Sequence, residues 1–323
     1  MDASCQPDVA VLVPCLNEEA TIGKVVADFR RALPGATVFV YDNGSIDRTL
    51  EVARRAGAVV RREPLRGKGN AVRRMFADVE ADVYVLVDGD DTYDASRAPE
   101  LVQRLLQDSL DMVNASRIET CAEAYRRGHR FGNVVLTGLV AWFFGERMKD
   151  MLSGYRVMSR RFVKSFPALA SGFEIETELT VHALQVRAPL AEVPTAYRER
   201  PPASTSKLRT IPDGIRILRL ITRLIREERP LEFFSTAAGV LALLALVLMW
   251  PVLQEYFATG LVPRFPTAIV ATGLAVMSFL SLACGLILAT VTRGRNEAKR
   301  LQYLAVPIRF SGRPALPARS TAA

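Results

Sequence analysis

The sequence has few of the residues that build zinc sites and disulfide frameworks. Its 323 residues include only two histidines, His129 and His182. The four cysteines lack the short spacings of metal-binding or disulfide motifs: Cys5, Cys15, Cys121 and Cys284. A histidine-rich zinc site and a disulfide-stapled fold are therefore excluded, and we expect the cysteines to be reduced.

Two common nucleotide-binding motifs and a secretory signal are also missing. The GKG of Gly67–Gly69 lacks the spaced upstream glycine and the following Ser or Thr of a P-loop, and no GxGxxG follows the first apolar run. No basic region precedes the first apolar run. We therefore expect neither a simple NTPase nor a dinucleotide enzyme, and we place the catalytic part in the cytosol.

The charge balance favours an anionic partner. Lys and Arg number 42 against 34 Asp and Glu, which gives a net charge of +8. A phosphorylated substrate, a membrane surface or a nucleic acid would each suit this excess. The basic residues gather in the middle and juxtamembrane segments without an interleaved aromatic platform, so we do not expect nucleic-acid binding.

Apolar β-type runs alternate with helical patterns from Val9 to Arg117. This alternation predicts an α/β fold with a mostly parallel sheet and helical crossovers. The fourth run, Val83–Val87, ends in the carboxylates of Asp88, Asp90 and Asp91. Clustered carboxylates suit Mg²⁺ or Mn²⁺ and hence a phosphate ligand. An acidic turn that caps the next helix is the alternative, and the run alone leaves both open.

Polar groups also follow the other predicted strands. They include Pro14, Asn17, Glu18, Asp42 and Lys68. Because parallel strands end at one edge of a sheet, we expect these groups to converge on one crevice. Taken singly, each has a simpler interpretation as a helix cap or a flexible turn.

The ordered motifs resemble family 2 glycosyltransferases of GT-A fold, and within them the polyprenyl-phosphate branch that includes dolichol-phosphate mannose synthase. The residues that carry the resemblance are VPCLNEE from Val13, YDNGSIDRT from Tyr41, GKG, VDGDD from Val87, ASR from Ala115, FGN from Phe131, DMLSGYR from Asp150 and STSKL from Ser204. The resemblance implies a Rossmann-like catalytic domain and transfer from a nucleotide diphosphate sugar, with inversion, to a polyprenyl phosphate.

The resemblance also implies roles for individual residues. The donor would contact Pro14, Asn17, Glu18, Asp42, Lys68 and Asp88. The metal would bind Asp88 and Asp90. The family often has a metal-side glutamine at the position that Thr92 occupies here, so either Asp91 or Thr92 would complete the coordination. The acceptor phosphate would contact Arg117, Arg130, Ser153, Arg156, Arg200, Ser206 and Lys207. Asp90, Arg117 and Arg130 would be catalytic. For Ser153 a structural role in the turn is equally compatible with the residues.

The C-terminal third has the pattern of a membrane anchor. Residues 233–254 and 265–292 are uncharged and long enough to span a bilayer. Arg216, Arg219, Arg223 and Arg226 precede them at helical spacing. We therefore expect a catalytic domain at residues 1–210, an interfacial helix at 211–232, two transmembrane helices at 233–292 and a cytosolic tail at 293–323. Flanking arginines place both termini in the cytosol, at an inner membrane.

Two other functions remain compatible with these patterns. A membrane-bound transferase acting on a hydroxyl of a lipid or glycan would need a general base, whereas a phosphate acceptor would not. A non-catalytic membrane-anchored scaffold would tolerate loss of the acids. UDP and GDP sugars are both compatible with the sequence, as are a monomer and a homo-oligomer.

Overall fold

The computed structural model describes residues 7–119, 150–172, 174–198 and 226–307. The chain divides into two compact units, which are described separately. The first comprises residues 1–210 together with 299–323, and the second comprises residues 211–298. Several residues with predicted roles lie outside the described parts, namely Arg130, Arg200, Ser206, Lys207, Arg216, Arg219 and Arg223.

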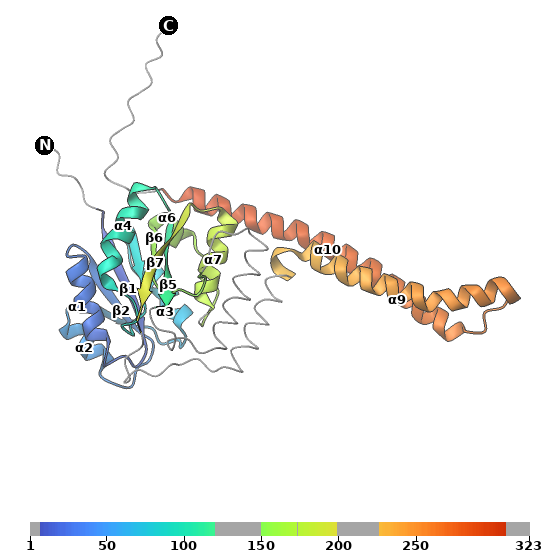
Figure 1. The fold of residues 1–323 in the computed structure, drawn as a ribbon, viewed down its shortest axis with the longest axis horizontal. Coiled ribbons are helices and arrows are strands. Elements are labelled where there is room, and N and C mark those ends of the chain that lie inside the picture. Colours follow the sequence, from blue (N-terminus) through green and yellow to red (C-terminus); the bar gives the residue numbers. More distant parts are fainter. Residues whose placement is uncertain (1–6, 120–149, 173, 199–225, 308–323) are drawn as a thin grey trace, which may run out of the picture. The chain divides into compact units, whose positions relative to one another are not determined.

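The first unit is built on a seven-stranded sheet with the order β3-β2-β1-β4-β6-β5-β7 (Figure 1). Strands β1 to β4 are mutually parallel, β6 runs antiparallel to both β4 and β5, and β7 is parallel to β5. The strands are β1 (Val9–Cys15), β2 (Thr37–Asp42), β3 (Val59–Arg62), β4 (Val83–Leu86), β5 (Met112–Glu119), β6 (Arg156–Ser159) and β7 (Leu190–Tyr197). The predicted mostly parallel α/β sheet is confirmed.

Helices cover both faces of this sheet because the central strands are apolar on both sides. In β1, Val11 and Val13 join the core under α1 (Ile22–Ala32) and α4 (Ala98–Gln107). The alternate residues, Ala10 and Leu12, join the core under α3 (Lys68–Asp78), α6 (Arg160–Ser165) and α7 (Ile175–Val186). The shorter helices α2 (Thr49–Arg55) and η1 (Ala95–Arg97) complete the layers. Strands buried on both faces explain the continuous apolar runs in the sequence.

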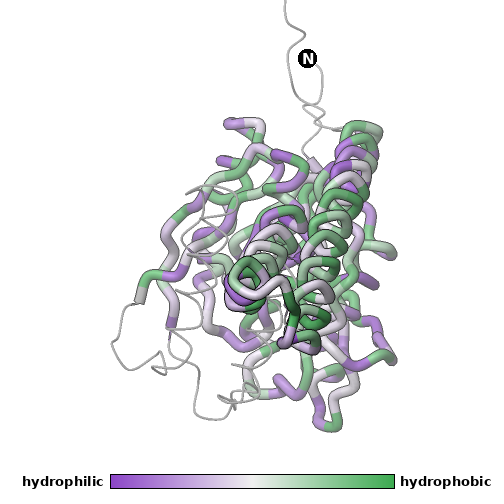
Figure 2. Tube along the Cα trace, turned by 90° about the vertical axis from the view of Figure 1, so that its right-hand side faces the viewer, coloured by the Kyte–Doolittle hydropathy of each residue, from purple (hydrophilic) through white to green (hydrophobic). Residues whose placement is uncertain are grey.

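The second unit is a hairpin of two long apolar helices. Helix α9 spans Pro230–Thr259 and α10 spans Phe265–Ala305, each with an apolar window of mean hydropathy 2.3. Only 17% and 6% of these windows are buried, whereas a core helix of a soluble domain would be mostly covered. Hydrophobic residues predominate along both helices in Figure 2. Both helices are therefore long and apolar enough to cross a membrane.

Small residues let the two helices of the hairpin pack closely. The hydroxyls of Ser278 and Ser281 donate to the carbonyls of Ala238 and Phe234 at 2.8 and 3.0 Å. A Cβ at Gly285 would lie 2.9 Å from the Cβ of Phe234. Interhelical hydrogen bonds and small residues are the usual means of association for helices in lipid, where apolar burial gives little driving force.

Helix α10 continues to Ala305, so the first part of the segment predicted as a cytosolic tail, residues 293–323, is helical. Good helix formers from Glu297 onward support this continuation. The last turns belong to the first unit, where Lys299 Nζ donates to Gln185 Oε1 at 2.6 Å and Arg300 Nε donates to the Gln185 carbonyl at 3.0 Å. The end of α10 thus packs on the C-terminal end of α7.

A buried carboxylate completes this docking. Asp111 is fully buried at the start of β5 and accepts a short hydrogen bond from the hydroxyl of Tyr303. It also accepts from Ser159 Oγ at 2.5 Å and from Arg161 Nη2 at 2.6 Å. The Arg161 guanidinium lies 4.4 Å from the centre of the Tyr303 ring. A buried charge of this kind stabilises the fold only while its partners are in place.

We predict that Tyr303→Phe destabilises the first unit, because it removes one hydrogen bond to a buried carboxylate and leaves the ring. The expected loss is about 2 kcal/mol in the free energy of unfolding. Urea unfolding of the full chain in detergent, followed by near-ultraviolet circular dichroism, measures it. Tyr256→Phe is the matched control, because Tyr256 is 47% exposed on α9. Equal unfolding curves for the two variants would show that the hydrogen bond from Tyr303 to Asp111 contributes nothing to stability.

Candidate functional site

The carboxyl ends of β1, β2 and β4 lie side by side and are tied together by backbone hydrogen bonds. Asn43 N donates to the Cys15 carbonyl at 2.9 Å, and Val87 N donates to the Leu12 carbonyl at 3.0 Å. The segments that follow these strands therefore start from one edge of the sheet, as the parallel pattern predicts.

The loops after β1 and β2 hold each other. Asn17 N donates to Ser45 Oγ at 2.8 Å, and Glu18 N donates to Thr49 Oγ1 at 2.9 Å. Glu18 is buried, whereas Asn17 is exposed. Pro14 is buried within β1 and precedes these loops. The residues predicted to contact the donor on this side thus lie on a braced pair of loops.

Asp42 and Asn43 organise the next loop. Asp42 is 1% exposed and accepts from Ser45 N at 3.0 Å. The Asn43 side chain donates to the Leu65 carbonyl at 2.6 Å and accepts from Gly67 N. Asn43 therefore connects β2 to the GKG turn, a role that its place after Asp42 in the sequence does not reveal.

Lys68 is the first residue of α3, and its ammonium forms ion pairs with both Asp88 and Glu176. Burial alone would lower the pKa of Lys68, but the charges of these two carboxylates raise it above its ordinary value. Burial raises the pKa of Asp88 to about 6 against the opposing charge of Lys68. Glu176, in the first turn of α7, was not predicted as a site residue.

Asp90 and Asp91 point to different partners. Asp90 is 4% exposed and accepts from Thr92 Oγ1 at 2.6 Å and from Thr92 N at 3.3 Å. Asp91 has φ of 59° and pairs with Lys24 of α1 at 2.6 Å. Thr92 thus orients Asp90, while the side chain of Asp91 is engaged by α1.

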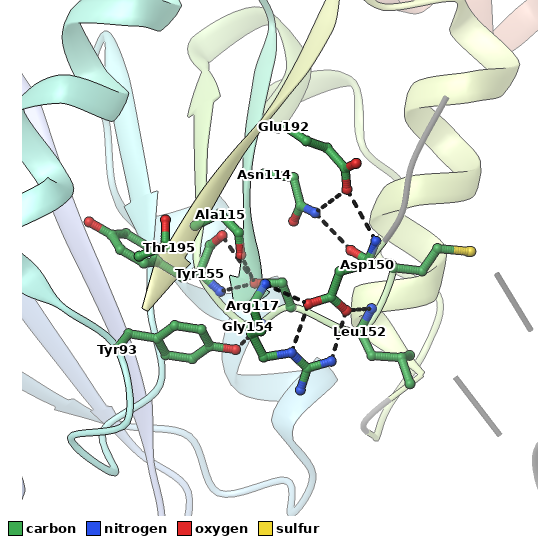
Figure 3. A network of polar contacts seen from close by, with 12 residues as sticks. Tyr93, Asn114, Ala115, Arg117, Asp150, Leu152, Gly154, Tyr155, Glu192 and Thr195 are labelled. Carbon is green, nitrogen blue, oxygen red and sulfur yellow. Dashed lines mark hydrogen bonds and ion pairs between the residues drawn. The ribbon is translucent and has the colours of Figure 1, made fainter. Parts of the chain in front are cut away.

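The turn at residues 150–155 brings a second group of polar residues to the site (Figure 3). Arg117, in β5, donates through Nε and Nη2 to the two oxygens of Asp150 at 2.7 and 2.8 Å. Its guanidinium also lies 5.5 Å from the centre of the Tyr197 ring. Burial alone would raise the pKa of Asp150, but the hydrogen bonds and charge of Arg117 lower it below its ordinary value. Arg117 is therefore held in one orientation.

Gly154 joins this turn to the acidic cluster. Its N–H donates to the Tyr93 hydroxyl at 2.7 Å (Figure 3). A Cβ at position 154 would lie 2.3 Å from Asp88 Oδ2, so a side chain there would displace the carboxylate. The close approach puts Asp88 and the Arg117–Asp150 pair on neighbouring parts of one site.

Arg156 and Ser153 lie in the interior, contrary to the predicted contact with phosphate. Both are 0% exposed. The Arg156 guanidinium donates to the carbonyls of Met151 and Ser153 at 2.6 and 3.1 Å, and burial lowers its pKa to about 10. Ser153 Oγ donates to the Ala115 carbonyl at 2.6 Å. These two side chains build the turn instead of reaching a ligand.

The described residues fit a Mg²⁺ or Mn²⁺ ion that also uses ligands from substrate. Within the described ranges, no group of three or more His, Cys, Asp or Glu side chains is placed to enclose a metal. Asp88 and Asp90 offer carboxylates two residues apart at the end of β4. Small divalent ions are commonly held by one or two carboxylates together with water and phosphate oxygens, which is what this pair can provide.

Comparisons with known proteins agree on one family. The profile of Glycosyl transferase family 2 matches residues 10–165. Glycosyltransferase AglJ of Haloferax volcanii is 34% identical over 254 residues, which cover 76% of this chain and 84% of that protein. A dolichyl-phosphate hexose transferase of the same organism is 34% identical over 223 residues, which cover 69% of this chain and 96% of that protein.

A solved structure is similar over about two thirds of this chain. It is glucosyl-3-phosphoglycerate synthase from Mycobacterium tuberculosis, in complex with Mn²⁺ and uridine-diphosphate-glucose. The match has a TM-score of 0.56 and 26% sequence identity, and it covers 69% of this chain and 79% of that one.

We predict that Asp150→Asn lowers the free energy of unfolding by about 2 kcal/mol at neutral pH, because Arg117 loses its buried counter-charge. A carboxyl with a lowered folded-state pKa stabilises the fold above its unfolded-state pKa, about 3.9, and this stabilisation is lost as the pH falls through the folded-state value. The difference between wild type and variant should therefore be constant above about pH 5 and close at lower pH.

Denaturant titrations from pH 3 to pH 7 measure this difference. Asp28→Asn is the control, because Asp28 pairs with Lys24 and Arg31 on the surface and should change stability by less than about 0.5 kcal/mol. A difference between wild type and Asp150→Asn that persists unchanged at low pH would contradict the assigned ion pair.

Proposed function

Because this chain belongs to glycosyl transferase family 2, we propose that it transfers a sugar from a nucleotide diphosphate sugar to a polyprenyl phosphate, with inversion at the anomeric carbon. The observation that carries the proposal is the presence, on one chain, of a site with donor-side carboxylates and a hairpin of two apolar helices. Two membrane-spanning helices would keep such a site close to a lipid-linked acceptor. The relative named as a dolichyl-phosphate hexose transferase supports the same acceptor class.

On the donor side, Asp88 and Asp90 would hold Mg²⁺ or Mn²⁺. The bound ion would act as a Lewis acid that neutralises the charge developing on the leaving diphosphate. Thr92 keeps Asp90 oriented, since its hydroxyl donates to the carboxylate at 2.6 Å. We assign Asp91 no part in this, because Lys24 engages it.

Lys68, Asp42 and the braced loops would bind the nucleotide diphosphate. Lys68 carries a permanent charge beside Asp88, because its two carboxylate partners keep its pKa high. Asp42 is buried beneath the loop that Asn43 ties to the GKG turn. Pro14, Asn17 and Glu18 would complete the nucleoside side by their place on the neighbouring loop.

On the acceptor side, Arg117 would align the lipid phosphate. A phosphate monoester is largely anionic near neutral pH, so it needs orientation and charge compensation more than a general base. The bidentate pairing with Asp150 keeps the guanidinium in place for this task. Arg130, Arg200, Ser206 and Lys207, which lie outside the described residues, remain proposed partners for phosphate by resemblance.

We assign the protein to the inner membrane, with two spans and with the catalytic unit and both termini in the cytosol. At the tip of the hairpin, Arg264 pairs with Glu255 at 2.8 Å, so the connection carries little net charge. At the other end lie Arg293 and Arg295, together with Arg229 before α9. Basic residues concentrate on the cytosolic side of membrane proteins.

The reaction is tested with a panel of UDP and GDP sugars, a polyprenyl phosphate and Mg²⁺ or Mn²⁺, with mass spectrometry of the lipid. We expect a glycosylated polyprenyl phosphate from one donor, and at least a hundredfold lower rate for Asp90→Asn, which weakens the charge compensation of the leaving group. Asp108→Asn, at an exposed pair with Arg104, should keep the wild-type rate. An alkali-stable product on a hydroxyl would contradict the proposed acceptor.

A further inference from the structure

Lys68 lies between two carboxylates that come from different elements. Asp88 follows β4, and Glu176 lies in the first turn of α7. We propose that Glu176 holds Lys68 when a divalent cation binds the Asp88 carboxylate, and that Glu176 thereby sets the affinity of the metal site. This inference rests on the metal site of the proposed function. Glu176 is then a positioning residue that acts through Lys68 and not a ligand of the metal.

The backbone fixes Lys68 in this place. Gly67 has φ of 124°, and a Cβ there would lie 2.1 Å from the Ser171 carbonyl oxygen. A Cβ at Gly69 would lie 2.1 Å from the Ala170 carbonyl oxygen, and Gly69 N donates to the Gly172 carbonyl at 3.1 Å. The GKG turn is therefore packed directly on the segment that leads into α7, which holds the backbone of Lys68 close to the start of that helix.

A divalent cation and the ammonium of Lys68 would compete for the same carboxylate. Lys68 already pairs with Asp88 Oδ1. A metal bound to that carboxylate would bring two like charges close together in a poorly solvated site, where they repel strongly. The Lys68 side chain is only 10% exposed, so its ammonium needs a protein partner if Asp88 turns to the metal.

Glu176 has an oxygen suited to this need. The residue is 5% exposed, and its Oε1 pairs with Lys68. Its Oε2 is buried and has no hydrogen-bond partner among the described residues. A small shift of the Lys68 side chain away from Asp88 would let the ammonium pair with both oxygens of Glu176. The unsatisfied oxygen thus offers the interaction that Lys68 would lose at Asp88.

The charges of the cluster also balance in this arrangement. Asp88, Asp90 and Glu176 carry three negative charges when ionised, and Lys68 carries one positive charge. The resulting net charge of −2 would be neutralised by one divalent cation. Removing the Glu176 carboxylate would leave Asp88 as the acidic partner of Lys68 in this cluster, so Lys68 would compete with the metal for Asp88. It would also leave less negative charge to attract a metal. Both effects weaken metal binding.

The test measures Mn²⁺ binding to the purified full chain in detergent by electron paramagnetic resonance, without donor or acceptor. We expect Glu176→Gln to raise the Kd for Mn²⁺ about tenfold, because Lys68 then stays on Asp88. Lys68→Met should lower the Kd, because the competing cation is gone. In the Lys68→Met background, Glu176→Gln should change the Kd by at most about threefold. Glu80→Gln is the control, since Glu80 is a 63% exposed partner of Arg160 and Lys164.

Two results would overturn the inference. An unchanged Kd for Glu176→Gln would show that Glu176 does not act on the metal site. An equal or larger effect of Glu176→Gln in the Lys68→Met background would identify Glu176 as a direct ligand. If thermal unfolding shows that Lys68→Met does not fold, Lys68→Gln, which retains a neutral donor, takes its place in the comparison.

This experiment is independent of sugar transfer. If the chain binds Mn²⁺ as expected but no polyprenyl phosphate is glycosylated, the acceptor assignment fails and the role of Glu176 stands. If transfer occurs while Glu176→Gln binds Mn²⁺ like wild type, the role of Glu176 fails and the function stands.

Discussion

The ion pairs of Lys68 with Asp88 and Glu176 join three elements that are distant in the sequence. They connect the start of α3, the end of β4 and the first turn of α7. The side chains of Lys68 and Glu176 are only 10% and 7% exposed, so their opposite charges compensate each other away from water. Gly154 packs against the same Asp88 carboxylate and extends this dependence to the turn that carries Asp150. The two groups of residues proposed to bind donor and acceptor are thus connected through Asp88.

Charged residues are also fixed by partners at both ends of strand β5. At the start of β5, Asp111 is buried and compensated by Arg161 and Tyr303, which lies 192 residues away in the sequence. At the other end of the same strand, Arg117 is fixed by Asp150. One strand therefore links the docked end of α10 to the residue proposed to align the acceptor phosphate.

Much of the fold could be predicted because the responsible signals are local. Continuous β-branched runs marked the parallel strands, and the carboxylates after Val87 marked the site. The role of Glu176 was not predictable, because an acidic residue in the first turn of a helix is already explained by the helix dipole, and its partner Lys68 lies 108 residues away. The resemblance also assigned Arg156 to phosphate, but tertiary packing buries its guanidinium among carbonyl groups. The docking of α10 has no local signal, since its polar residues would equally suit a solvated helix.

The chain belongs to glycosyl transferase family 2, and its proposed acceptor is a lipid phosphate. The most direct test of that claim is phosphorus NMR of the lipid during turnover of the full chain with its nucleotide sugar. Transfer to the phosphate converts a monoester into a diester, so we expect the monoester resonance of polyprenyl phosphate to decline as a diester resonance grows. Consumption of the nucleotide sugar with an unchanged monoester resonance would contradict it.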